Sequence, residues 1–114
     1  MTQACWKPCD DGSTIGEKGS ENGTIIRDEE YSEGARVTLE KGGTIAPYSI
    51  TCGVYGWMVH TCFYSTENEA SQAFNEIKSN LENIVSLIPL EDDPNLKDKQ
   101  NLLVDAIEAF VTKY

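Results

Sequence analysis

The chain has 114 residues, and its nineteen acidic and nine basic side chains give a formal net charge of −10. That length is typical of one domain with one hydrophobic core. Because an acidic surface repels phosphate, the charge argues against binding to nucleic acid or to anionic membranes. It either keeps a small domain soluble or attracts a basic protein partner. We find no membrane-length apolar run and no signal-like N-terminus, so we expect a cytoplasmic protein.

Residues 1–23 are rich in Gly, Ser, Asp and Glu and contain little apolar material. Such a composition is typical of turns, so we expect a loop-like N-terminal arm with Cys5 and Trp6 as its only obvious anchors. Residues 24–114 should then form a single α+β domain.

Residues 24–64 carry the strand signals. Residues 24–27 are β-prone, and residues 35–41 alternate between apolar and polar side chains, which is the pattern of a half-buried strand. Residues 48–64 contain no charged side chain if His60 is neutral, which predicts a place in the middle of the sheet. Seventeen residues are too many for one ordinary strand, so we expect two strands, 48–54 and 57–64, with a single bent strand carrying a glycine bulge as the alternative.

Two helices should follow the strands. Thr66 and Glu69 fit a capping box, and apolar residues then recur every three or four positions as far as Ile88, before Pro89 ends the helix. A second apolar stripe runs from Leu96 to Tyr114, after a possible cap and first turn at 93–94. The order of elements predicts an antiparallel β-meander of about four strands followed by two amphipathic helices packed on one face.

The chain contains four cysteines, Cys5, Cys9, Cys52 and Cys62, whose thiols are candidate metal ligands or redox groups. Cys5 and Cys9 have three residues between them, which is not the spacing of a thioredoxin-like redox motif. A zinc site would need Cys52, His60 or Cys62 as further ligands, without any standard spacing. We therefore predict no metal and no cofactor, and we interpret Cys52 and Cys62 as packed core thiols.

No nucleophile elbow, phosphate loop or other catalytic signature occurs in the sequence, so we favour a protein that is not an enzyme. Our first hypothesis is a non-catalytic protein-binding module, in its most concrete form an inhibitor or immunity-type protein that masks a basic partner. The predicted contact residues combine an acidic run with aromatic residues at a turn, as binding hot spots often do. They are Asp28, Glu29, Glu30, Tyr55 and Trp57.

The alternative hypothesis is a small-molecule-binding domain or minor enzyme with a cleft between the sheet and the helices. His60 is the only histidine, and acid–base chemistry would require a polar partner beside it. Glu40 and Tyr31 are the candidates that neighbouring strands could supply. A concave pocket containing His60 is the feature that distinguishes this hypothesis from the first.

Overall fold

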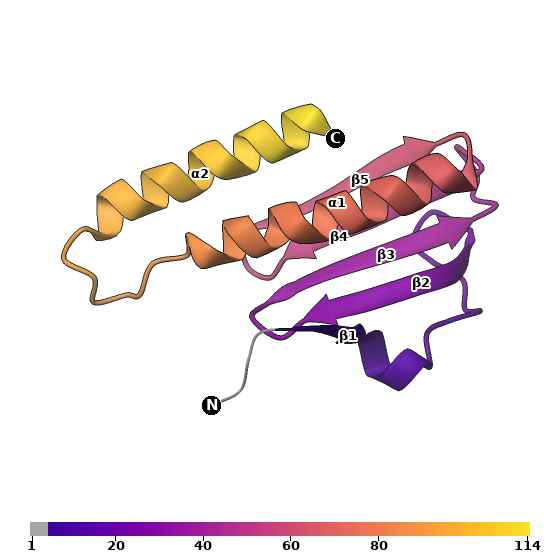
Figure 1. The fold of residues 1–114 in the computed structure, drawn as a ribbon, viewed down its shortest axis with the longest axis horizontal. Helices are drawn as coiled ribbons and strands as arrows, with labels where there is room; N and C mark the ends of the chain where they lie inside the picture. Colours follow the sequence, from indigo (N-terminus) through magenta and orange to yellow (C-terminus); the bar gives the residue numbers. More distant parts are fainter. Residues whose placement is uncertain (1–4) are drawn as a thin grey trace.

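The computed structural model describes residues 5–114, in which a five-stranded antiparallel sheet is followed by two long helices (Figure 1). The strands pair in chain order, each with the next, as a simple meander. The elements are β1 (Trp6–Pro8), the short 3₁₀ helix η1 (Cys9–Gly12), β2 (Thr24–Tyr31), β3 (Ala35–Lys41), β4 (Tyr48–Val54), β5 (Met58–Tyr64), α1 (Glu67–Ser86) and α2 (Leu96–Lys113).

Helix α1 begins where the sequence predicts. The Thr66 hydroxyl accepts a hydrogen bond from the backbone N–H of Glu69 at 3.2 Å, so it satisfies one of the donors that a helix start leaves free. Helix α2 begins two residues later than the cap suggested at 93–94. The Asp93 carboxylate accepts the backbone N–H of Asn95, and the first helical residue is Leu96.

The hydrophobic core lies between α1 and one face of the sheet. Helix α1 contacts β3, β4 and β5, while α2 packs beside α1 (Figure 1). The alternation predicted for 35–41 is confirmed, because Ala35, Val37 and Leu39 are all fully buried under the helix layer. The apolar stripe of α1 covers them with its buried residues Ala70, Ala73, Phe74, Ile77, Leu81 and Ile84.

The expected sheet of about four strands gains a fifth, β1, from the N-terminal segment. Three residues are too few to give a period-2 signal, and Trp6-Lys7-Pro8 does not look β-prone. The strand is held by the Trp6 ring, which packs on Tyr31 with 5.0 Å between centroids. Besides the expected anchors Cys5 and Trp6, backbone pairing of β1 with β2 therefore also holds the N-terminal segment on the sheet.

Strand β2 is longer than predicted and contains a bulge. It continues through Asp28, Glu29 and Glu30, and its register with β3 shifts between Ile25 and Arg27. The extra residue brings Ile25 and Asp28, three positions apart, to the same face of the sheet. That face is the one opposite α1, and we call it the open face.

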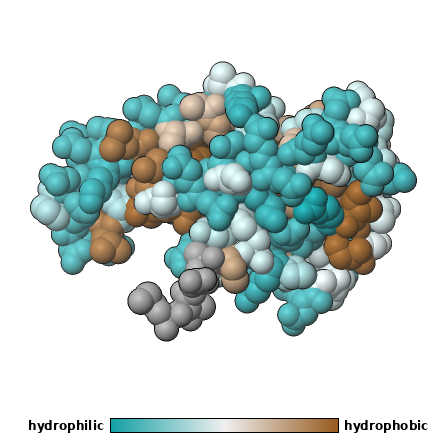
Figure 2. Space-filling model, in the orientation of Figure 1, coloured by the Kyte–Doolittle hydropathy of each residue, from teal (hydrophilic) through white to brown (hydrophobic). Residues whose placement is uncertain are grey.

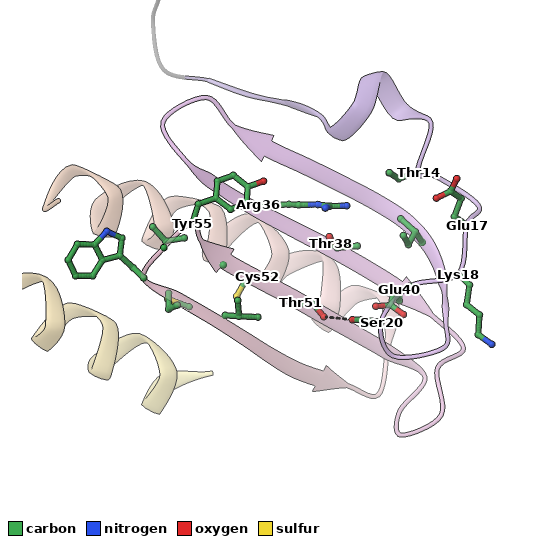
Figure 3. Close-up of a pocket in the computed structure, with 18 residues that line it drawn as sticks. Thr14, Glu17, Lys18, Ser20, Arg36, Thr38, Glu40, Thr51, Cys52 and Tyr55 are labelled. Carbon is green, nitrogen blue, oxygen red and sulfur yellow. Dashed lines mark hydrogen bonds between the residues drawn. The ribbon is translucent and has the colours of Figure 1, made fainter.

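Residues 9–23, which we call the strap, lie over one half of the open face (Figure 3). Apart from a contact between Ser20 of the strap and Thr51 of β4, strands β4 and β5 have no layer above them on this face among residues 5–114. In Figure 2 the helix side of the molecule is mostly hydrophilic, with hydrophobic residues gathered in a few separate places. No helix within residues 5–114 is long and apolar enough to cross a membrane.

Candidate functional site

A hollow of about 730 Å³ lies on the open face of the sheet (Figure 3). Its floor is formed by alternate residues of β3, β4 and β5, which point away from the helices. The strap forms one wall, from Thr14 to Ser20, and the β4–β5 turn forms the other, from Tyr55 to Trp57. The volume lies in the range of ordinary ligand sites, and the hollow is also wide enough for a partner's side chains.

An ion pair anchors the floor beside the strap. The Arg36 guanidinium donates to both carboxylate oxygens of Asp28, at 3.0 and 2.6 Å, and the Thr38 hydroxyl donates to Asp28 Oδ1 at 2.9 Å. The Asp28 side chain is fully buried, while 39% of the Arg36 side chain remains exposed to the hollow. Burial alone would raise the pKa of Asp28, but the hydrogen bonds from Arg36 and Thr38 outweigh it and lower that pKa below its usual value.

Glu40 ties the strap to the sheet. Its side chain is wholly buried, and its Oε1 atom accepts the backbone N–H groups of Glu21 and Gly23, each at 3.1 Å. The strap also approaches so closely that a Cβ atom on Gly19 would overlap Cδ of Glu40. Ser20 adds a hydroxyl contact to Thr51 of β4 at 3.3 Å, drawn in Figure 3. The Glu40 carboxylate therefore fixes the wall together with backbone hydrogen bonds that join Gly16 and Glu17 to Ile25 of β2.

Two aromatic side chains project from the opposite wall. Tyr55 and Trp57 are 56% and 40% exposed, and Gly56 between them has φ +83°, a conformation that the turn needs and glycine adopts readily. The Tyr55 hydroxyl donates to Glu30 Oε2 at 2.7 Å. Partial burial together with this hydrogen bond raises the pKa of Tyr55 to about 12, so the phenol stays protonated at neutral pH.

The structure separates the five predicted contact residues into two groups. Tyr55 and Trp57 line the hollow, and Glu30 accepts a hydrogen bond from the Tyr55 hydroxyl. Asp28 is buried against Arg36, which lines the floor of the hollow. Glu29 points to the helix face, where Lys78 and Arg27 donate to its carboxylate at 2.7 and 3.1 Å. The acidic run is therefore not a continuous exposed patch, because alternate residues of a strand point to opposite faces.

The residues of the alternative hypothesis are not brought together. His60 and Tyr31 share the helix face but stand on β5 and β2, with two strands between them, which puts them roughly 14 Å apart. Glu40 lies on the other face, under the strap. The His60 ring meets the edge of Phe110 of α2, with 6.3 Å between centroids, and does not line the hollow.

The hollow could not be predicted from the sequence, because its strap wall depends on contacts between distant residues. In the sequence, Arg36 and Thr38 looked like ordinary polar positions of a half-buried strand, and Thr51 lay within a segment expected in the middle of the sheet. The one available signal was the alternation of β3, which assigned Arg36, Thr38 and Glu40 to a face away from the core.

All four cysteines are free thiols in the structure. Cys52 and Cys62 are buried on the helix face and donate to the backbone carbonyls of His60 and Ile50. Burial raises the pKa of Cys9 and of Cys62, and it raises the pKa of Cys52 to about 12. No group of three or more metal-ligating side chains is found within residues 5–114.

We expect the thiols to differ sharply in reactivity. Thiolate is the reactive form, so buried thiols with raised pKa values react slowly, whereas Cys5 is exposed. Titration of the native protein at neutral pH with a colorimetric disulfide reagent should give one fast-reacting thiol, and titration in denaturant should give four. Loss of the fast phase in Cys5→Ser assigns it. A fast-reacting thiol that remains in Cys5→Ser would contradict the burial of the other three cysteines.

Comparison of the chain with protein-family models, with curated proteins and with solved structures finds no significant match.

Proposed function

We propose that this chain is a non-catalytic protein-binding module of the inhibitor or immunity type, and that it masks a basic partner with the open face of its sheet. The observation that carries the proposal is the pair of exposed aromatic residues, Tyr55 and Trp57, beside a hollow in a chain of net charge −10. Large aromatic side chains at the centre of an interface commonly supply most of its binding energy.

The aromatic wall is held in place before any partner arrives. The Tyr55 hydroxyl is fixed by Glu30, and its backbone N–H donates to the carbonyl of Gly34 at 3.0 Å. Trp57 is tied into the turn by a hydrogen bond from its N–H to the carbonyl of Val54 at 2.9 Å. Groups that are already ordered lose less entropy on binding, which favours tight association.

The charge of the strap supports a basic partner. Asp10, Asp11 and Glu17 make no ion pair within the part of the chain that the structure describes, so their charges are directed to solvent. The Arg36 charge is balanced by Asp28. The strap lies across the hollow from the aromatic wall and carries four carboxylates and one lysine, Lys18. This negative surface would raise the association rate of a positively charged protein, and that acceleration would fall with salt.

The test is capture from the lysate of the source organism on immobilised protein, run in parallel with Trp57→Ala and with Leu102→Ala, an exposed residue of α2. We expect one basic protein to bind the original chain and Leu102→Ala alike. Trp57→Ala should bind this protein about 30-fold more weakly, with a dissociation constant about 30-fold higher, as expected for a hot-spot residue.

Two results would argue against the proposal. The first is a partner retained equally by Trp57→Ala, which would place the contact elsewhere. The second is an association rate that does not change with salt, which would remove the role of the acidic strap.

Small-molecule binding is a second candidate, favoured by the size of the hollow and by the polar groups of Arg36, Thr38 and Thr51 on its floor. In this version of the alternative hypothesis, the ligand binds in the hollow and not beside His60. A ligand screen read by Trp57 fluorescence would identify it, provided that Trp57→Phe abolishes the signal and Trp6→Phe does not.

A further inference from the structure

Strand β5 is an open edge of the sheet. The strand order places β1 at one edge and β5 at the other, and no strand within residues 5–114 pairs with the outer side of β5. An edge strand presents unpaired N–H and C=O groups that can pair with another chain.

The two edge strands, β1 and β5, differ in length and in residue composition. Strand β1 has only three residues, and two of them are Lys7 and Pro8, which are the residue types that commonly protect an edge from pairing. Strand β5 has seven residues in unbroken register with β4 and contains no proline and no Lys, Arg, Asp or Glu. Its side chains Val59 and Phe63 are 80% and 40% exposed on the open face.

The outward backbone groups of β5 can be identified. The Cys52 thiol donates to the carbonyl of His60, so that carbonyl points toward β4. Because backbone groups alternate along an antiparallel strand, the N–H and C=O groups of Val59, Thr61 and Phe63 point outward. The residues with free backbone groups are thus the same ones whose side chains face the open side.

We propose that β5 pairs with β5 of a second copy of this chain, antiparallel and centred on Thr61, so that two sheets join into one. In this register Val59 pairs with Phe63 of the other copy, Thr61 pairs with its own equivalent, and all seven residues of each β5 are opposed. The outward groups would make about six backbone hydrogen bonds. The proposal goes beyond partner masking and does not depend on it.

The charge distribution favours a second copy as the occupant. Two chains of charge −10 repel one another, but residues 48–64 carry no charge if His60 is neutral, so β5 lets two copies meet without opposed carboxylates. The exposed side chains are also self-complementary, because the two-fold axis through Thr61 sets an aliphatic residue against an aromatic one twice. The two open faces would become one continuous surface.

The first experiment measures the mass of the full chain in solution by sedimentation equilibrium over a wide concentration range. We expect a monomer–dimer equilibrium that tightens when salt rises from about 0.01 to about 0.15 M, since the Debye length falls from about 30 to about 8 Å. A monomer at every concentration and salt overturns the proposal, and so does strand addition that occurs only with a different protein.

The second experiment uses charge complementation at the two-fold axis. Thr61→Lys and Thr61→Glu each place like charges opposite one another, so each should weaken the dimer at least about tenfold, and their mixture should restore it as a heterodimer. Ile45→Lys, an equally drastic change at an exposed loop residue, is the control and should leave the dimer intact. A mixture that stays monomeric, or a dimer that survives in Thr61→Lys, contradicts this register.

Amide hydrogen exchange on the unaltered chain gives a readout that does not rely on any variant folding. On concentration, the amides of Val59, Thr61 and Phe63 should exchange at least about tenfold more slowly, while those of His60 and Cys62, already paired with β4, should not change. Equal protection of all five amides, or none, would mean that β5 is not the interface.

Discussion

Replacing Glu40 by alanine should lower the free energy of unfolding by about 3 kcal/mol. The change removes the acceptor of two backbone N–H groups, those of Glu21 and Gly23, in a place where the Glu40 side chain has no exposure. Each buried donor left without a partner costs about 1–3 kcal/mol. Urea unfolding of the two proteins, followed by Trp fluorescence, measures the difference.

Glu40→Gln is the matched control for that result. The two hydrogen bonds of 3.1 Å end on Oε1, so the glutamine carbonyl can accept both of them. The charge is lost, together with the longer contact of 3.4 Å from the Glu21 N–H to Oε2. We expect a loss of about 1 kcal/mol. Equal losses in the two variants would mean that charge matters and that the strap hydrogen bonds do not. A loss under about 0.5 kcal/mol in Glu40→Ala would mean that the strap is not held by this residue.

The layered α+β fold follows from local patterns that the sequence displays openly. The 35–41 alternation, the Thr66 cap and the apolar stripe of α1 each involve residues close in the chain, and each is confirmed. The bulge in β2 was not predictable, because it exchanges the faces of Ile25 and Ile26 through a pairing with β3 that period-2 analysis cannot detect. Strand β1 was missed because its Trp6–Tyr31 contact joins distant segments.

At the candidate site, too, only features set by residues close in the chain could be predicted from the sequence. Tyr55 and Trp57 flank a glycine turn, which is a local signal, and both lie at the hollow. Asp28, Glu29 and Glu30 looked like one acidic patch because they are adjacent in sequence, but within a strand they alternate between faces and two of them are neutralised by cations. The role of Glu40 depends on how the strap folds over the sheet. The strap has no helical or strand periodicity, so this role could not be predicted from the sequence.

Replacing Asp28 by asparagine should destabilise the protein by about 3 kcal/mol at neutral pH. The asparagine carbonyl can still accept hydrogen bonds from Arg36 and Thr38 at the position of Oδ1. Its N–H₂ group would face the second Arg36 donor, so the carboxylate charge and the 2.6 Å hydrogen bond of the ion pair are lost. Removing one member of a buried pair typically costs about 3–5 kcal/mol, and the partial exposure of Arg36 places this case at the low end.

The difference between the original protein and Asp28→Asn should also depend on pH, in a direction that the structure fixes. The pKa of Asp28 is lower in the folded chain than its unfolded value of about 3.9, so its stabilising contribution is complete above that value. It is lost as pH falls through the unfolded and then the folded pKa. Urea unfolding from pH 7 down to about pH 2 should therefore show the two proteins converging in stability.

Glu33→Gln provides the control for this titration, because Glu33 is an exposed residue of the β2–β3 turn that makes no ion pair within residues 5–114. It should change stability by less than about 0.5 kcal/mol at every pH. Glu29, whose pKa is also lowered against burial by Lys78 and Arg27, remains in both variants, so some acid destabilisation should persist. A gap between the original protein and Asp28→Asn that stays constant from pH 7 to pH 2 would show that the carboxylate charge of Asp28 contributes nothing to the fold. The floor of the hollow would then be held by packing alone.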